Sequence, residues 1–304
     1  TLILINVVCY LWLYRERLKA DKVVVVGLLG ITLLASTGLM GEYYQWGHDL
    51  DFHMLRIEGL KDGILSGTFP VRIQPNWVNG WGYPVSVMYG DLTLIVPALL
   101  RVIGVPVQDA YKWFVVLVNF GTALSAYICF KKISKSKYIG LTVSLLYTLS
   151  VYRMCCLYIR AAVGEYTAMM FLPMVVLCFY HALAENTEDS DYGKNLWIPV
   201  LGFTGLLQTH ILTCQMAAIF IVLLCVFAYK KIFVKKTFIY LSKVAGISIF
   251  INLWFIVPLI QYMGEELNVM VAEFDGKIQR VGITLMELFA PIYNGTFGTH
   301  WNEI

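Results

Sequence analysis

The sequence predicts an all-α protein that crosses a membrane several times, and two observations support this class. Of its 304 residues, 59% are hydrophobic and only 14% are charged, and the mean hydropathy is +0.68. These values lie far outside the range of water-soluble globular proteins. In addition, long apolar runs alternate with short basic clusters, as expected for helices that cross a bilayer and turn in the cytoplasm.

Three basic clusters fix the expected orientation, because cytoplasmic turns are enriched in Lys and Arg. They lie in residues 15–19, 131–137 and 230–236. Keeping all three in the cytoplasm requires an even number of crossings between successive clusters. After an incomplete first span in residues 1–14, the predicted spans are residues 23–40, 109–130, 138–152, 164–184, two short ones within 195–229, and 237–262.

Residues 86–104 are also apolar, but a crossing there would carry the lysines of 131–137 to the outside. We therefore expect an interfacial or re-entrant helix there, within a large extracytoplasmic loop of residues 41–108. Residues 1–262 would then form one transmembrane module, followed by an extracytoplasmic segment, 263–304. Because the sequence starts and stops without an evident terminal element, we expect it to be part of a longer protein.

The densest group of polar residues follows the span at 23–40. Residues 47–56 contain His48, Asp49, Asp51, His53 and Arg56. On a helix, Asp49, His53 and Arg56 would share one face. We interpret the stretch as a polar active-site helix on the membrane surface, and the alternative is a solvated loop whose charges only face water.

Further ionisable residues are predicted on the same external side. Charged groups near membrane depth are costly and usually line a cavity or a substrate path. Arg160 would bind a phosphate, and Glu165 would orient the phosphate or a sugar hydroxyl. The alternatives are that Arg160 extends to lipid headgroups and that Glu165 complements a helix dipole. His210 and Arg72 are weaker candidates for substrate binding. His210 could instead be a satisfied polar residue at a helix turn, and Arg72 could instead contact a lipid phosphate.

Aromatic residues in the same loop have two interpretations. Trp77, Trp81, Tyr83 and Tyr89 would form an interfacial aromatic belt or stack on sugar rings. The seven cysteines are scattered, mostly within apolar runs, and lack metal-binding spacing, so they indicate core residues and no disulfide framework.

Four stretches carry a resemblance to a known family. They are GHDLDFHMLRIEGL (47–60), GTFPVRIQPNWVNGWGYPVSVMYGDL (67–92), LYIRAAVGEYTA (157–168) and QTHILT (208–213). With them, the chain resembles the bacterial YfhO-like membrane proteins, some of which are labelled 6-pyruvoyl-tetrahydropterin synthase-related and which belong to the GT-C glycosyltransferase superfamily. The resemblance covers residues 23–262. The segment 88–92 departs from it, because it lacks two prolines that are frequent in the family.

The resemblance implies a GT-C-like helix bundle with interfacial helices in its first external loop. It implies a glycosyltransferase of the bacterial plasma membrane that moves a sugar, with inversion, from a polyprenyl-phosphate donor to an extracytoplasmic acceptor such as a cell-wall polymer or lipoteichoic acid. Asp49 matches the position of the catalytic carboxylate, with Asp51 as second choice and His53 beside them. The substrate-binding set would be Arg56, Arg72, Tyr83, Tyr89, Arg160, Glu165 and His210.

Two questions remain open at the level of sequence. Asp49, Asp51 and His53 would also suit a divalent cation, Mg or Mn, that bridges the phosphate. The expected partners are the lipid-linked donor, the bilayer and a glycan acceptor, with no nucleic acid. The alternatives to an enzyme are a non-enzymatic flippase or transporter of lipid-linked sugars and an inactive scaffold subunit.

Overall fold

The computed structural model describes residues 21–42 and 47–263, and within these ranges the regular structure is helical, without a strand. The predicted span 1–14 and nearly all of the predicted segment 263–304 lie outside the described residues. The chain divides into two compact units, residues 1–258 and 259–304, and the arrangement below concerns the first.

Most of the apolar runs form the helices of a bundle. These helices are α2 (Lys22–Ala35), α6 (Val107–Ser134), α7 (Lys137–Thr148), α8 (Val151–Tyr158), α9 (Val163–Ala168), α10 (Leu172–Ala184), α11 (Trp197–Leu207), α12 (Ile211–Phe227), α13 (Tyr229–Ile232) and α14 (Lys235–Met263). Between α2 and α6 lie α3 (Leu50–Leu65), α4 (Val85–Met88) and α5 (Ile95–Val102), with short 3-10 helices at Thr37–Leu39 and Val78–Gly80.

Three of the described helical segments are long and apolar enough to cross a membrane. They are Val107–Ser134, Val163–Ala184 and Lys235–Met263, and α7 with α8 makes a fourth if this pair, bent by 45°, is one span. α2, α11 and α12 are apolar but shorter. These helices confirm the predicted all-α membrane fold. Because α4 and α5 have only 4 and 8 residues, they also agree with the expectation that residues 86–104 do not cross.

Local sequence explains several helix ends. Asp21 caps α2, its carboxylate accepting a hydrogen bond from the Val23 N–H at 3.1 Å, and the Ser136 hydroxyl caps α7 in the same way. Lys137 forms an ion pair with Asp21 and so joins the starts of α7 and α2. Pro106 directly precedes α6, where its missing N–H is not needed.

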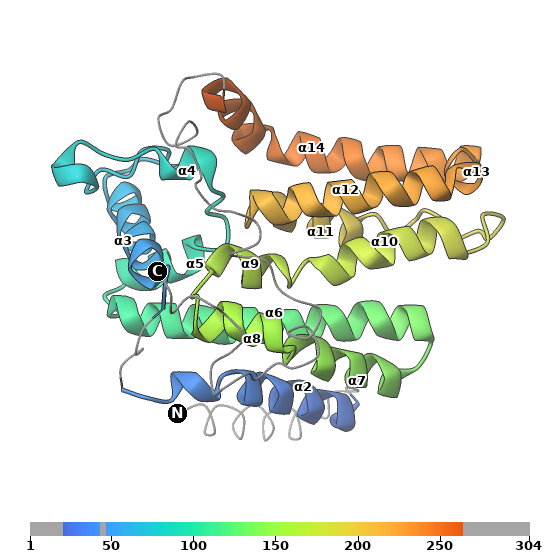
Figure 1. Ribbon diagram of the computed structural model, residues 1–304, viewed down its shortest axis with the longest axis horizontal. Coiled ribbons are helices and arrows are strands. Elements are labelled where there is room, and N and C mark those ends of the chain that lie inside the picture. The colour runs from blue at the N-terminus through green and yellow to red at the C-terminus, as the bar shows by residue number, and fades with distance from the viewer. Residues whose placement is uncertain (1–20, 43–46, 264–304) are drawn as a thin grey trace, which may run out of the picture. The chain divides into compact units, whose positions relative to one another are not determined.

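The helices of the first unit define two ends (Figure 1). The axes of α6, α10, α12 and α14 are roughly parallel, with α14 running opposite to the other three, whereas α3 lies across them at one end, beside α5 and the start of α9. The α6–α7 turn and α13, where two of the lysine clusters lie, are at the opposite end. There Lys231 donates a hydrogen bond to the Leu183 carbonyl and Lys236 pairs with Glu188, so the last cluster borders the 185–194 loop.

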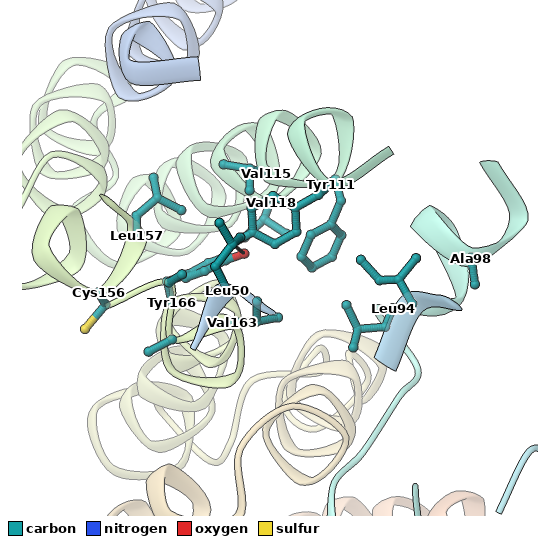
Figure 2. Close-up of a cluster of buried hydrophobic side chains, with 14 of the residues drawn as sticks. Leu50, Leu94, Ala98, Tyr111, Val115, Val118, Cys156, Leu157, Val163 and Tyr166 are labelled. Carbon is teal, nitrogen blue, oxygen red and sulfur yellow. Dashed lines mark hydrogen bonds between the residues drawn. The ribbon is translucent and has the colours of Figure 1, made fainter. Parts of the chain in front are cut away.

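The largest buried cluster fixes α3 to the bundle. Side chains from α3, α5, α6, α8 and α9 converge in it (Figure 2). Leu50 and Ile57 of α3 are buried there with Tyr111 and Val115 of α6 and Tyr166 of α9. Burial of apolar side chains is the main source of stability in such a contact. The polar residues of α3 are therefore held in a fixed position at this end.

Candidate functional site

Asp49 is positioned by a backbone contact with a distant segment. The N–H groups of His48 and Asp49 donate hydrogen bonds to the carbonyls of Ile159 and Arg160, at 3.3 and 2.9 Å. Gly47 permits this approach, because a Cβ there would lie 2.6 Å from the Cβ of Ala161. The start of α3 is thus tied directly to the segment that carries Arg160.

The Asp49 carboxylate remains available for chemistry. Asp49 is the N-cap residue of α3, yet its side chain makes no capping hydrogen bond, and the residue is exposed. Partial desolvation raises the pKa of Asp49 above its usual value, although Arg160 and His48 act in the opposite direction; Glu165 raises it further. A carboxylate with a raised pKa is a better proton acceptor than an ordinary surface aspartate. Asp51, in the next position but one, is also exposed.

Arg160 and Glu165 form a two-point ion pair beside Asp49. The two terminal nitrogens of Arg160 donate to the two carboxylate oxygens of Glu165, both at 2.8 Å. Tyr152 donates its hydroxyl to Glu165 at 2.8 Å, and the Cys156 thiol lies 3.3 Å from the same oxygen. The side chain of Arg160 is 29% exposed. A partly exposed arginine whose guanidinium is held in this way is suited to a phosphate.

Two further segments meet close to Arg160 and Glu165. Tyr89 packs edge-on against His210, with ring centroids 6.1 Å apart. A Cβ on Gly164 would lie 1.9 Å from the Tyr89 hydroxyl, and one on Gly90 would lie 2.4 Å from the Gln208 carbonyl oxygen. Only glycine permits these approaches. The backbone of α9 at Gly164 therefore packs against the Tyr89 side chain, and the backbone at Gly90 packs against the backbone of the turn before α12.

His210 is held at the start of α12 through one of its ring nitrogens. It is the N-cap residue of α12, and its Nδ1 accepts a hydrogen bond from the Thr213 N–H at 3.3 Å. Burial lowers the pKa of His210, and Arg160 lowers it as well, against an opposite effect of Glu165. The lowered pKa favours the neutral imidazole, which is a hydrogen-bonding group.

Arg56 differs from its predicted role in phosphate binding. Its side chain is fully buried, forms an ion pair with Asp91 and donates a hydrogen bond to the Gly90 carbonyl at 2.9 Å. The guanidinium also lies over the Tyr89 ring, 4.1 Å from the centroid. Since both terminal nitrogens face protein groups, we reassign Arg56 from substrate binding to positioning of the 89–91 segment on α3.

His53 likewise differs from its predicted catalytic role. It is 2% exposed, and its Nδ1 lies 3.4 Å from a terminal nitrogen of Arg56. Burial holds the pKa of His53 well below its usual range, and the charge of Arg56 lowers it further. A neutral buried imidazole that faces an arginine cannot serve as the base for an external hydroxyl. We reassign His53 to a structural role.

Arg72 reaches the last described helix. It donates a hydrogen bond to the Trp254 carbonyl at 3.1 Å. Pro258 lies within α14, four residues later, and its missing N–H leaves that carbonyl without its helical donor. Arg72 therefore satisfies a backbone group that Pro258 exposes, and its predicted phosphate contact stays a prediction.

Tyr83 belongs to an aromatic row and not to the group around Asp49. Its ring stacks on Trp77 with centroids 5.2 Å apart, and Trp77 packs edge-on against Phe52. Phe52 in turn lies 6.5 Å from Tyr89, centroid to centroid. The row thus continues from the 66–84 segment to Tyr89 and His210.

The predicted cation site is not assembled in the part of the chain that the structure describes. Residues 21–42 and 47–263 contain no group of three or more His, Cys, Asp or Glu side chains placed to hold a metal ion. Of the three predicted ligands, His53 faces Arg56.

Sequence reasoning missed several residues that the structure places here. Asp91, the partner of Arg56, was noticeable as the one acidic residue in the apolar run 86–104. Tyr152 and Cys156, which contact Glu165, gave no signal, because tyrosines and cysteines are common in the spans of this chain.

The fold and the polar group at one end of the bundle define a polytopic α-helical membrane protein with a candidate site at the helix ends. A family model described as "6-pyruvoyl-tetrahydropterin synthase related domain; membrane protein" matches residues 88–301, more than half of the chain. The chain belongs to this family of membrane proteins. The matched range begins after α3, so it includes Arg160, Glu165 and His210 but not Asp49. Searches of curated proteins and of solved structures found no match.

Proposed function

We propose that this protein is a GT-C-type glycosyltransferase that moves a sugar from a polyprenyl-phosphate donor to an acceptor hydroxyl outside the cytoplasm. The observation that carries the proposal is the placement of Asp49. An exposed carboxylate with a raised pKa is hydrogen-bonded through its backbone to the segment that carries a partly exposed arginine. Transfer from a sugar phosphate needs these two groups: a base for the nucleophile and a cation for the leaving phosphate.

In the proposed reaction, Asp49 accepts the proton of the acceptor hydroxyl as its oxygen attacks the anomeric carbon. The bond between this carbon and the phosphate oxygen breaks, and its electron pair leaves with the polyprenyl phosphate. Arg160 stabilises the charge on that phosphate, while Glu165 fixes the guanidinium. A single displacement inverts the anomeric configuration. His210 would hydrogen-bond a sugar or phosphate oxygen.

The proposed site lies at the end opposite the lysine clusters of α13 and the α6–α7 turn (Figure 1). Since Lys and Arg accumulate on the cytoplasmic side, this supports an extracytoplasmic site in a bacterial plasma membrane. Lipid-linked donors present their phosphate at that membrane surface, level with the helix ends. The acceptor would be a glycan or polymer of the cell envelope.

The test is the substitution Asp49→Asn in the full chain, reconstituted with a radiolabelled polyprenyl-phosphate hexose and an envelope extract as acceptor. We expect loss of transfer by at least about 100-fold, in line with removal of a general base, with unchanged membrane insertion. Asp109→Asn is the matched control, because Asp109 is also an exposed acid in the first turn of a helix, α6. It should retain activity.

Asp51→Asn separates the two exposed carboxylates of α3. Activity that survives Asp49→Asn but not Asp51→Asn would transfer the role of base to Asp51. Activity retained in both variants, or movement of the intact donor across the bilayer without transfer, would contradict the proposal and favour a flippase.

A further inference from the structure

The segment between α3 and α4, residues 66–84, presents apolar side chains in two directions. Val71 is buried against α3, where a Cβ on Gly63 would lie 2.4 Å from it. By contrast, Phe69, Val78 and Trp81 point outward, with 67%, 61% and 89% of their surface exposed. Exposed large apolar groups that gather in one segment usually mark a contact surface.

Two of the exposed side chains, Val78 and Trp81, are carried by an ordered turn. Gln74 and Tyr83 exchange two backbone hydrogen bonds, at 2.9 and 3.0 Å. The Gln74 side chain donates to the Ser86 hydroxyl at 3.0 Å and accepts from the Trp77 indole N–H at 2.9 Å. The turn between Gln74 and Tyr83 is therefore fixed at its base, and its tip holds Val78 and Trp81.

Arg72 fixes the level of this segment relative to a membrane-spanning helix. It binds the Trp254 carbonyl in α14, one of the described helices that is long and apolar enough to cross a bilayer. Trp254 and Val257 on α14 are themselves exposed. Arg72 thus ties the 66–84 segment to a helix that exposes apolar side chains beside the point of contact.

We propose that the 66–84 segment docks on the bilayer, with Trp81 and Val78 entering the boundary between headgroups and acyl chains. The partner is the lipid of the membrane that α14 crosses. Tryptophan is favoured at this boundary because its ring is apolar and its N–H remains hydrated. Burying the exposed apolar side chains of the tip in lipid removes them from water. In this proposal Trp81 contacts lipid, whereas the rings of Trp77 and Tyr83 stack on each other within the protein.

The experiment measures depth directly, and its outcome does not depend on transferase activity. A cysteine-free version of the full chain receives a single spin-labelled cysteine, Trp81→Cys, in nanodiscs of phosphatidylethanolamine and phosphatidylglycerol. Collisions with oxygen, which concentrates in lipid, are compared with collisions with a water-soluble nickel chelate. Phe220→Cys on α12, where the side chain is 69% exposed, and Asp51→Cys on α3 provide the lipid and water references.

We expect the label at position 81 to collide with oxygen in preference to nickel, as the label at 220 does. A label that behaves like the one at 51 would overturn the proposal, as would one protected from both reagents, which would indicate a protein contact. A second measurement avoids the label: brominated lipids should quench less of the total tryptophan fluorescence in Trp81→Phe than in the unaltered protein. Equal quenching would also contradict docking.

Discussion

Residue environment separates the charged groups of α3 into two kinds. Arg56 and His53 point into the protein, where the Arg56 guanidinium pairs with Asp91 and donates a hydrogen bond to the Gly90 carbonyl. Removing one member of such a buried pair leaves an uncompensated charge, which costs several kcal/mol, about 3–5. Asp49 instead is exposed at the start of the helix, and its side chain is not used as a cap. The same helix therefore holds its own position with one set of charges and exposes another at its start.

The raised pKa of Asp49 predicts the acid limb of the pH profile. A base must be deprotonated, so transfer should fall as pH decreases through the pKa of Asp49, which lies above the ordinary value of 3.8. Glu165→Gln removes a negative charge that raises this pKa, and it releases Arg160, which lowers it. We expect the limb to move to lower pH in this variant, whatever the loss in maximal rate.

The measurement is the midpoint of log(kcat/KM) against pH. Glu58→Gln is the control, because Glu58 lies on another part of α3, where it pairs with Lys61 and with Arg101 of α5. Its midpoint should stay unchanged. A midpoint that moves to higher pH in Glu165→Gln would contradict Asp49 as the titrating base.

Elements that are far apart in sequence make contact at positions where a proline frees a backbone carbonyl or a glycine leaves space for a neighbour. Pro258 removes one backbone donor from α14, and Arg72, which lies 182 residues from Trp254, replaces it. Because Gly164 and Gly90 have no side chain, the Tyr89 hydroxyl can approach Gly164 and the Gln208 carbonyl can approach Gly90. In each case, a residue that does not support its own helix or turn fully allows a distant element to make contact there.

The contact between Arg72 and α14 predicts a specific coupling. Arg72→Gln should destabilise the protein by about 1 kcal/mol, the net value of a typical hydrogen bond, since the side chain is half-buried. Pro258→Ala restores the N–H that the Trp254 carbonyl lacks. In that background Arg72→Gln should cost close to nothing.

Thermal unfolding in detergent provides the double-mutant cycle. Arg101→Gln is the matched control, since Arg101 pairs with Glu58 and not with α14. Its cost should be the same with and without the Pro258→Ala substitution. Additive effects of Arg72→Gln and Pro258→Ala would exclude the proposed exchange of donors.

For the whole molecule, the important property is the separation of two chemically different ends. The lysine clusters of 131–137 and 230–236 lie at the end with α13 and the α6–α7 turn, while α3 and the start of α9 lie at the other (Figure 1). Since an excess of Lys and Arg in turns marks the cytoplasmic side, the end with Asp49 should face outward. The proposed enzyme depends on this orientation.

Cysteine labelling tests the orientation. In a cysteine-free background, Asp51→Cys should react with a membrane-impermeant maleimide in intact cells. Lys194→Cys, also exposed but in the 185–194 loop at the other end, should react only after permeabilisation. The reverse pattern would place the site in the cytoplasm and end the proposal of an extracytoplasmic transferase.

The sequence by itself determined the membrane class, the approximate positions of the helices and the gathering of Asp49, Arg160, Glu165 and His210 at one end. Hydropathy and lysine positions suffice for this, because a bilayer imposes length and orientation on every helix that crosses it. Only the tertiary structure decided which charges are used internally. Arg56, His53 and Arg72 resemble ligand-binding residues in sequence, but the partners of the two arginines, Asp91 and the Trp254 carbonyl, lie 35 and 182 residues away. Contacts of this kind depend on how helices pack, and periodicity along one chain does not encode them.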